Sequence, residues 1–61
     1  MGFSLLIRHG KRGKVYGIAV PGDYSKGSIG VYASEGYHFH AYRETYGQCI
    51  ALLECLELEF A

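Results

Sequence analysis

The sequence predicts a small α+β domain, an antiparallel meander sheet of three to four strands with one C-terminal helix packed on one face. Three observations support this prediction. Short segments in the first two-thirds of the chain alternate apolar and polar residues with period two, as strands do. Glycine and proline separate these segments, whereas the last third spaces its apolar residues as a helix does. With 61 residues the whole chain, 1–61, is expected to be a single domain.

Four strands are expected, at residues 3–9, 14–20, 29–33 and 37–42. The first two flank Gly10-Lys11-Arg12-Gly13, which suits a hairpin turn because glycine adopts the positive φ that short turns need. Pro21 and Gly22 end the second strand, and Ser34-Glu35-Gly36 supplies a turn before the fourth.

The last third of the chain, 43–60, is expected to form one helix. Its apolar residues fall within one broad arc of a helical wheel, namely Tyr46, Cys49, Leu52, Leu53, Leu56 and Phe60. Residues 56–60 also alternate with period two, so an edge strand there is the alternative. The single helix is favoured because no glycine, proline or asparagine lies between Gln48 and Ala61 to turn the chain.

A single helix covers only one face of such a sheet, and strand alternation assigns residues to the two faces. The face beneath the helix is expected to carry Phe3, Leu5, Ile7, Tyr16, Ile18, Val20, Ile29, Val31 and Phe39. The opposite face is expected to present Leu6, Val15, Ala19, Tyr32, His38, His40 and Tyr42. This second face is too apolar for an ordinary solvent face and too polar for a core, so it suits a binding or dimer surface.

The zero net charge of the chain hides an uneven distribution. Residues 1–30 carry five Lys and Arg against one Asp, and residues 31–61 carry one Arg against five Glu. A basic hairpin and an acidic helix are therefore expected in one small body. Arg8, Lys11, Arg12 and Lys14 cluster around the hairpin turn, where they would steer an acidic partner toward the protein. Two other interpretations of this charge distribution stay open. The basic and acidic ends are simply solvated, or the basic end of one subunit pairs with the acidic helix of another.

The two cysteines are expected to be reduced. Cys49 and Cys55 are six residues apart on the predicted helix, roughly 9 Å along its axis, which exceeds the separation that a disulfide tolerates. Reduced thiols favour a cytoplasmic location. The apolar run at 3–7 is too short for a signal peptide or a membrane span, so no membrane partner is expected.

The sequence carries no signature of catalysis or of a bound cofactor, and neither an enzyme nor a metal site is predicted. His38 and His40 are the most suggestive pair, because residues i and i+2 of a strand project to the same side. Zinc needs a third and usually a fourth ligand, but Cys49 belongs to the helix side and His9 has the parity of the core face. Surface imidazoles or polar contacts in an interface are therefore favoured.

These features favour a non-enzymatic protein-binding module that presents a surface, and a homodimer is expected. The predicted partner-binding residues are Tyr32, His38, His40, Tyr42, Arg8, Lys11, Arg12 and Lys14. A minor apolar stripe on the helix, formed by Ala51, Cys55 and Leu58, is a candidate dimer contact. Chains of this size and style are typical of phage and mobile-element proteins that inhibit a host enzyme or defence system.

A nucleic-acid-binding module is the alternative. It would use the basic hairpin to bind phosphates and the aromatic residues of the open sheet face to stack on bases. The neutral overall charge and the acidic helix count against it, because binding to a phosphate backbone is driven electrostatically.

Overall fold

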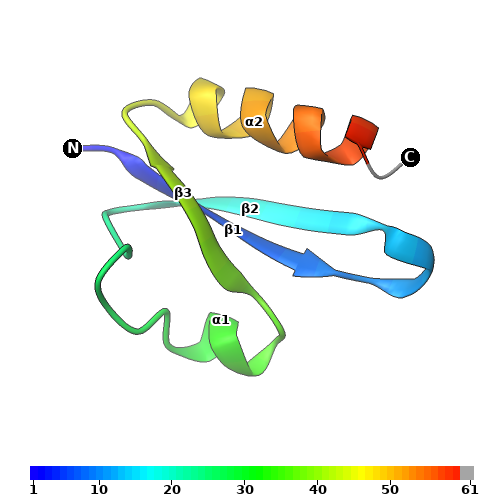
Figure 1. Cartoon of the computed structure of the whole chain (residues 1–61). Helices are drawn as coiled ribbons and strands as arrows, with labels where there is room; N and C mark the ends of the chain where they lie inside the picture. Colours follow the sequence, from blue (N-terminus) through cyan, green and yellow to red (C-terminus); the bar gives the residue numbers. More distant parts are fainter. Residues whose placement is uncertain (60–61) are drawn as a thin grey trace.

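The computed structural model describes residues 1–59, which form a three-stranded antiparallel sheet and a C-terminal helix (Figure 1). This arrangement confirms the α+β class. The elements in chain order are β1 (Phe3–His9), a short 3₁₀ turn η1 (Lys11–Gly13), β2 (Val15–Pro21), α1 (Val31–Ser34), β3 (His38–Arg43) and α2 (Tyr46–Glu59).

The strand order is β2-β1-β3, so β1 is the central strand and the sheet is not the expected meander. The run Leu5-Leu6-Ile7 in β1 is apolar on both faces, and none of the three residues is more than 4% exposed. A continuous apolar run of this kind is typical of a strand that is covered on both faces. Proline is confined to edge strands because it lacks an N–H group, so Pro21 favours an edge position for β2.

The predicted strand at 29–33 is wrong. Val31–Ser34 form the single helical turn α1, in which the Ser34 hydroxyl donates to the Val31 carbonyl at 2.7 Å. Gly30 and Gly36 on either side have φ values of +62° and +93°, and this left-handed conformation interrupts a strand. Both edges of β1 are already paired, so the central strand has no edge left for residues 29–33.

α2 begins at Tyr46 instead of residue 43 because Thr45 caps it. The Gln48 N–H donates to Thr45 Oγ1 at 3.1 Å, and the Thr45 N–H donates to Gln48 Oε1 at 3.1 Å. This reciprocal pair is a capping box, which satisfies N–H groups that lack partners inside the helix. Residues 56–59 are helical, so the edge-strand alternative is wrong for them, and Phe60 lies outside the described residues.

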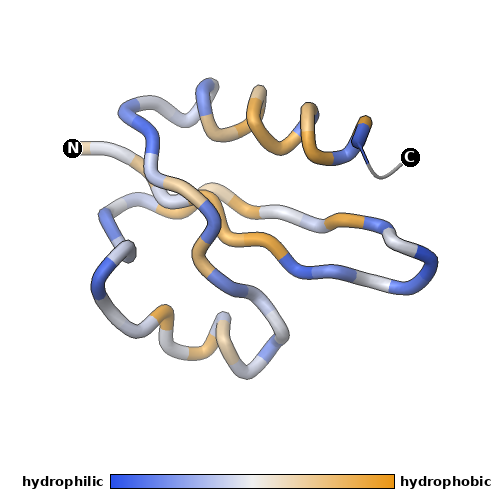
Figure 2. The backbone as a smooth tube through the Cα atoms, in the orientation of Figure 1, coloured by the Kyte–Doolittle hydropathy of each residue, from blue (hydrophilic) through white to orange (hydrophobic). Residues whose placement is uncertain are grey.

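One part of the core lies between the sheet and α2. Its buried residues are Leu5, Ile7, Val15 and Cys49, with Phe3, Ala19, Leu52, Leu53 and Leu56 packed around them. The prediction for the helix-facing residues of β1 is therefore confirmed. Figure 2 shows the same distribution along the chain, with hydrophobic residues concentrated in α2 and the middle of the sheet and hydrophilic residues at the hairpin end.

The face of β2 that packs against the helix is the one that the prediction assigned to the open side of the sheet. Leu5 pairs with Ala19 and Ile7 pairs with Gly17, so the small residues of β2 share a face with the core of β1. This small size lets α2 approach closely, because a Cβ added to Gly17 would lie 2.5 Å from Leu53 Cδ1. The larger even-numbered residues, Tyr16, Ile18 and Val20, face away from the helix.

The second face of the sheet is also covered, by the connection 22–37 between β2 and β3, which lies on the opposite side of the sheet from α2 (Figure 1). Leu6, expected on an open face, is fully buried. Ser4 is also fully buried, and its hydroxyl donates to the Gly22 carbonyl at 2.7 Å and accepts from the Tyr24 N–H at 2.9 Å. The sheet is thus the middle of three layers, and the expected one-sided arrangement is wrong.

Besides Tyr16, Ile18 and Val20, three further residues expected beneath the helix lie elsewhere. Phe39 pairs with Leu6 and therefore belongs to the second face of the sheet. Ile29 is half-buried within the connection, and Val31 in α1 is 71% exposed. The apolar alternation at 29–33 therefore belongs to the connection between β2 and β3 and not to a further strand.

Candidate functional site

The hairpin between β1 and β2 ends in a tight turn that displays three cations. The Gly10 N–H donates to the Lys14 carbonyl at 2.7 Å, and the Lys14 N–H donates to the Lys11 carbonyl at 3.2 Å. The chain reverses here because Arg12 and Gly13 adopt positive φ values of +61° and +76°. Lys11, Arg12 and Lys14 are consequently all exposed at the end of the hairpin.

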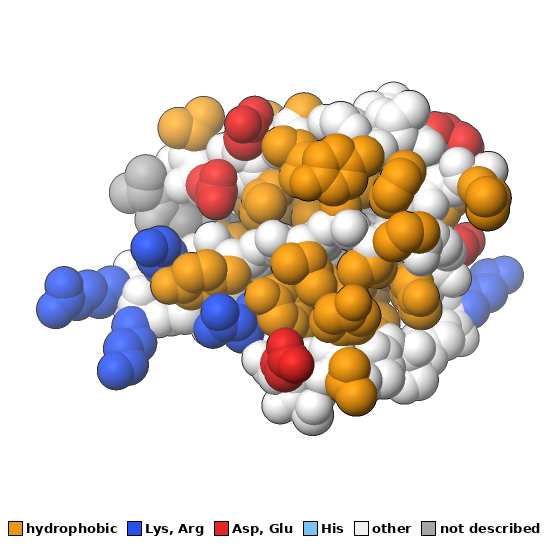
Figure 3. Space-filling view, turned by 180° about the vertical axis from the view of Figure 1, so that it is seen from behind, with side chains coloured by type: hydrophobic (Ala, Val, Ile, Leu, Met, Phe, Trp, Pro, Cys, Tyr) orange, Lys and Arg blue, Asp and Glu red, His pale blue; other side chains and the backbone are white. Residues whose placement is uncertain are grey.

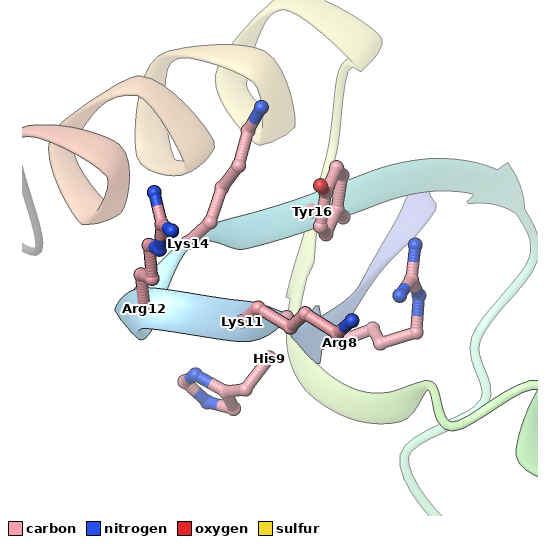
Figure 4. A pocket seen from close by; sticks show the side chains of 7 residues that line it. Arg8, His9, Lys11, Arg12, Lys14 and Tyr16 are labelled. Atoms are coloured by element: carbon pink, nitrogen blue, oxygen red, sulfur yellow. The ribbon is translucent and has the colours of Figure 1, made fainter.

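An open concavity of about 760 Å³ lies at this end of the hairpin (Figure 4). The residues that line it are Arg8, His9, Gly10, Lys11, Arg12, Lys14 and Tyr16, and we refer to them as the basic hairpin site. All four cations that the sequence analysis singled out therefore lie together. The lining contains no Asp or Glu.

Tyr16 organises two of the cations. The register places Arg8 opposite Tyr16, and Arg8 Cζ lies 4.3 Å from the centroid of the Tyr16 ring. Lys14 Nζ lies 5.3 Å from the same centroid, and in Figure 4 the two side chains are on opposite sides of the ring. Cation–π contacts of this kind contribute about 0.5–1 kcal/mol each at exposed sites. The ring therefore holds both charges near the concavity.

Arg8 is the most constrained of the four cations. Its Cζ also lies 5.5 Å from the centroid of Tyr37. Its aliphatic stem passes Gly36, where an added Cβ would lie 3.2 Å from Arg8 Cδ. Arg8 is half-buried as a result, so its guanidinium is positioned before any ligand arrives, whereas the three cations at the turn extend into solvent.

The positive charge of the site is not balanced by carboxylates among residues 1–59. No described Asp or Glu forms an ion pair with Arg8, Lys11, Arg12 or Lys14. Like charges around one concavity repel one another, and an anion placed among them removes that repulsion. Because screening acts over about 10 Å at 0.1 M salt, the four cations act together on a ligand in dilute buffer.

The aromatic residues of the predicted site, Tyr32 and Tyr42, are not among the residues that line the basic hairpin site. Tyr32 belongs to α1 and packs edge-on against Tyr37, with ring centroids 6.4 Å apart. Tyr42 pairs with Ser4, near the end of the sheet remote from the hairpin, and its ring lies against Gly2. Both tyrosines are half-buried. They do not form a single surface with the four cations.

The two histidines of β3 are separated by an irregularity in the sheet. β3 pairs Phe39 with Leu6 and Ala41 with Leu5, which leaves His40 unpaired in a β-bulge. The bulge interrupts the alternation on which the expected pairing of His38 with His40 depended. His38 instead stacks on His9 at the edge of the basic hairpin site, with ring centroids 5.9 Å apart, while His40 is exposed.

The helix stripe faces solvent. Ala51 and Cys55 are exposed and Leu58 is 78% exposed, so the role of this stripe as a dimer contact stays a prediction. Cys49 is fully buried and its Sγ donates to the Phe3 carbonyl at 3.6 Å. Both cysteines are free thiols, Cys49 in the core and Cys55 at the surface.

Two residues of the basic hairpin site were missed by sequence reasoning. Tyr16 was assigned to the core beneath the helix, and His9 was given the parity of the same face. The length of the turn is the signal that would have identified Tyr16. A turn that pairs His9 with Val15 places Arg8 directly opposite Tyr16. An arginine and an aromatic residue in opposite positions form a favourable pair across strands.

No protein-family model, curated protein or solved structure matches the chain. Within residues 1–59, no helix has both the length and the apolar composition needed to cross a membrane. No three His, Cys, Asp or Glu side chains of the described residues converge as metal ligands do. The basic hairpin site is therefore the feature from which the function is inferred.

Proposed function

We propose that the chain is a non-enzymatic protein-binding module whose basic hairpin site recognises an acidic surface on another protein. The observation that carries this proposal is the convergence of four cations in one concavity that contains no carboxylate. Ammonium and guanidinium groups form charge-assisted hydrogen bonds to carboxylates, and one arginine can bind a carboxylate through two of them. Arg8 is already oriented by Tyr16, which lowers the entropy lost on binding.

Three features favour an acidic protein over a nucleic acid. The expected stacking residues Tyr32 and Tyr42 do not line the concavity in which the cations lie. Tyr16 has a cation on each side of its ring in Figure 4, so it offers no free face to a base. α2 carries exposed Glu57 and Glu59 and ends on the side of the molecule where the hairpin turns (Figure 1), so a long polyanion would meet carboxylates there.

Inhibition of a host enzyme or defence protein is the specific form of this proposal. A small domain that covers an acidic surface blocks the contacts that this surface makes with other molecules. The exposed turn of the hairpin supports such a role, because a narrow basic projection reaches into acidic clefts that exclude a broad surface. A phage or mobile-element origin, suggested by the size of the chain, is consistent with this role.

The test compares two probes, a fluorescent polyglutamate peptide and a single-stranded oligonucleotide of equal charge, by fluorescence anisotropy at low and physiological salt. Lys11→Glu and Lys26→Glu change the net charge equally, but Lys26 lies in the connection outside the basic hairpin site. We expect Lys11→Glu to weaken peptide binding about five- to tenfold, roughly 1–1.4 kcal/mol. Lys26→Glu should change it less than about twofold, since it contacts no ligand and acts only at long range.

Equal weakening by the two variants would show that net charge and not the site governs binding, and would refute the proposal. Tighter binding of the oligonucleotide than of the peptide, with an affinity that falls steeply as salt rises, would replace it with the nucleic-acid function. Circular dichroism of each variant confirms that the fold is retained.

A further inference from the structure

The outer edge of β2 has backbone groups available for pairing. The Gly22 N–H donates to the Gly2 carbonyl at 2.9 Å, and the Lys14 carbonyl accepts from Gly10, so even-numbered residues direct their backbone groups toward β1. Because this direction alternates along an antiparallel strand, Gly17 and Ala19 direct their N–H and C=O groups outward. No hydrogen bond within residues 1–59 uses these outward groups.

β2 lacks the features that protect an edge strand from association. It contains no charged residue, and its pairing with β1 has no bulge. Pro21, the last residue of the strand, is odd-numbered, so its backbone nitrogen is on the side away from β1. The lack of an N–H group there therefore removes no hydrogen bond to β1. The opposite edge, β3, has a bulge, two histidines and Arg43. Bulges and charges are the usual means of blocking an edge, so the two edges of this sheet differ in kind.

The surface around the β2 edge is apolar. Figure 3 shows hydrophobic side chains gathered across the middle of the rear face, with most of the visible Lys and Arg at one end. On β2, Tyr16 is 37% exposed and Ile18 is half-buried, and Leu53 of α2 is half-buried above Gly17. A strand added at this edge would find backbone partners and apolar contacts together.

The charges that flank β2 identify a second copy of the chain as the occupant. Lys14 precedes the uncharged strand and Asp23 follows it. Hydrogen bonds from the hydroxyl and the N–H of Ser25 lower the pKa of Asp23, so its carboxylate is charged at neutral pH. When two copies of this segment run antiparallel, the Lys14 end of each lies beside the Asp23 end of the other. The pattern is therefore complementary to itself about a two-fold axis.

We infer that two copies of the chain associate through β2, joining their three-stranded sheets into one continuous sheet. With the two-fold axis at Ile18, Gly17 of each copy lies opposite Ala19 of the other, and each such pair exchanges two backbone hydrogen bonds. An axis at Ala19 would instead set Gly17 against Pro21, which has no N–H to donate. The register centred on Ile18 avoids pairing Pro21 with a residue of the other strand, and it is the register that the inference adopts.

The inference of this dimer does not rest on the partner proposed for the basic hairpin site, although Lys14 lies at the end of the paired strands and also lines that site. The two-fold axis keeps both α2 helices on one face of the joined sheet and sends the two hairpin turns to opposite ends. Each basic hairpin site stays open to its own ligand, so the dimer would present two equivalent sites. Association through β2 also supplements the small core of a chain of 61 residues.

The first test is a disulfide between copies, made in a Cys55→Ala background that removes the exposed native thiol. Ile18 would face itself in a non-hydrogen-bonded pair, whose Cα separation of about 4.5 Å suits a disulfide. Ile18→Cys should therefore form a covalent dimer under mild oxidation. In Tyr16→Cys the two thiols would be four residues out of register, about 13 Å apart, so this variant should stay uncross-linked.

The second test uses the unmodified chain and a charge exchange outside the strand. Light scattering should give twice the chain mass of 6.8 kDa. Asp23→Lys places like charges at both ends of the pairing and should weaken the dimer on the order of tenfold, and adding Lys14→Asp should restore it.

A monomer at the highest soluble concentration, equal cross-linking of the two cysteine variants, or failure of the second exchange to restore association would each overturn the inference. Lys14 and Asp23 are exposed, so exchanging their charges should leave the fold intact. The charge exchange therefore tests the dimer even if Ile18→Cys does not fold.

Discussion

Replacing Leu6 by alanine tests whether the second face of the sheet is covered. Leu6 is fully buried and, as the neighbour of Leu5 in the strand, belongs to the face opposite α2, which is the face that the connection 22–37 covers (Figure 1). Truncating a buried leucine removes its transfer free energy and leaves a cavity, which together cost about 2–5 kcal/mol. If that face were open, the cost would be within about 0.5 kcal/mol, as at other exposed positions.

The expected loss is large for a domain of this size. A chain of 61 residues has a free energy of unfolding of roughly 3–9 kcal/mol, so Leu6→Ala should remove about a fifth of it or more. Each kcal/mol lowers the melting temperature of a small domain by about 4–8 °C, so a fall of at least about 8 °C is expected. Urea unfolding followed by circular dichroism measures the change directly.

Two leucines provide matched controls for Leu6. Leu5 is fully buried beneath α2, and Leu58 is 78% exposed on the outer side of the same helix. Leu6→Ala should resemble Leu5→Ala and differ clearly from Leu58→Ala in the midpoint of unfolding. A Leu6→Ala protein as stable as Leu58→Ala would refute the three-layer arrangement, and with it the reason given for the absence of an open aromatic face.

Three further substitutions test the local interactions that shape the fold. Ser4→Ala removes the hydroxyl that bridges the connection to β1 and should cost about 1–3 kcal/mol in urea unfolding; a neutral result would mean that the connection is held by other contacts. Thr45→Ala should lower the free energy of unfolding by about 0.5–2 kcal/mol and reduce the helical signal in circular dichroism, while Thr45→Ser should keep the cap. Equal losses of stability in the two variants would contradict the capping box. Gly17→Val should destabilise by about 1–3 kcal/mol, despite the high strand propensity of valine, because its Cβ meets Leu53; a stabilised variant would show that α2 lies farther from β2.

Local periodicity was sufficient to predict the elements that have a regular pattern. β1 spans 3–9 as expected, and β2, β3 and α2 differ from their predicted limits by a few residues at most. Alternation and helical spacing depend only on neighbouring residues, so a single sequence reveals them. The same property explains the error at 29–33, where Ile29, Val31 and Ala33 alternate like a strand although Val31–Ser34 form a helical turn between two glycines of positive φ.

The faces of the strands depend on information that periodicity does not contain. Shifting a hairpin register by one residue exchanges the two faces of a strand, and the turn that fixes this register was only approximately delimited. As a result Tyr16 was placed under the helix, whereas it lies opposite Arg8 in the basic hairpin site. The cations themselves were found because three of them lie within or beside the turn, where either register leaves them exposed.

The central position of β1 affects how the molecule is assembled during synthesis. β1 is synthesised before the elements that pair with it or pack on it, and its hairpin partner β2 follows after only a short turn. β3 and α2 come after β2 in the chain, so the second edge of β1 is paired only once β3 has been made. Contacts close in sequence form fastest, which favours the hairpin as the nucleus on which the later segments condense.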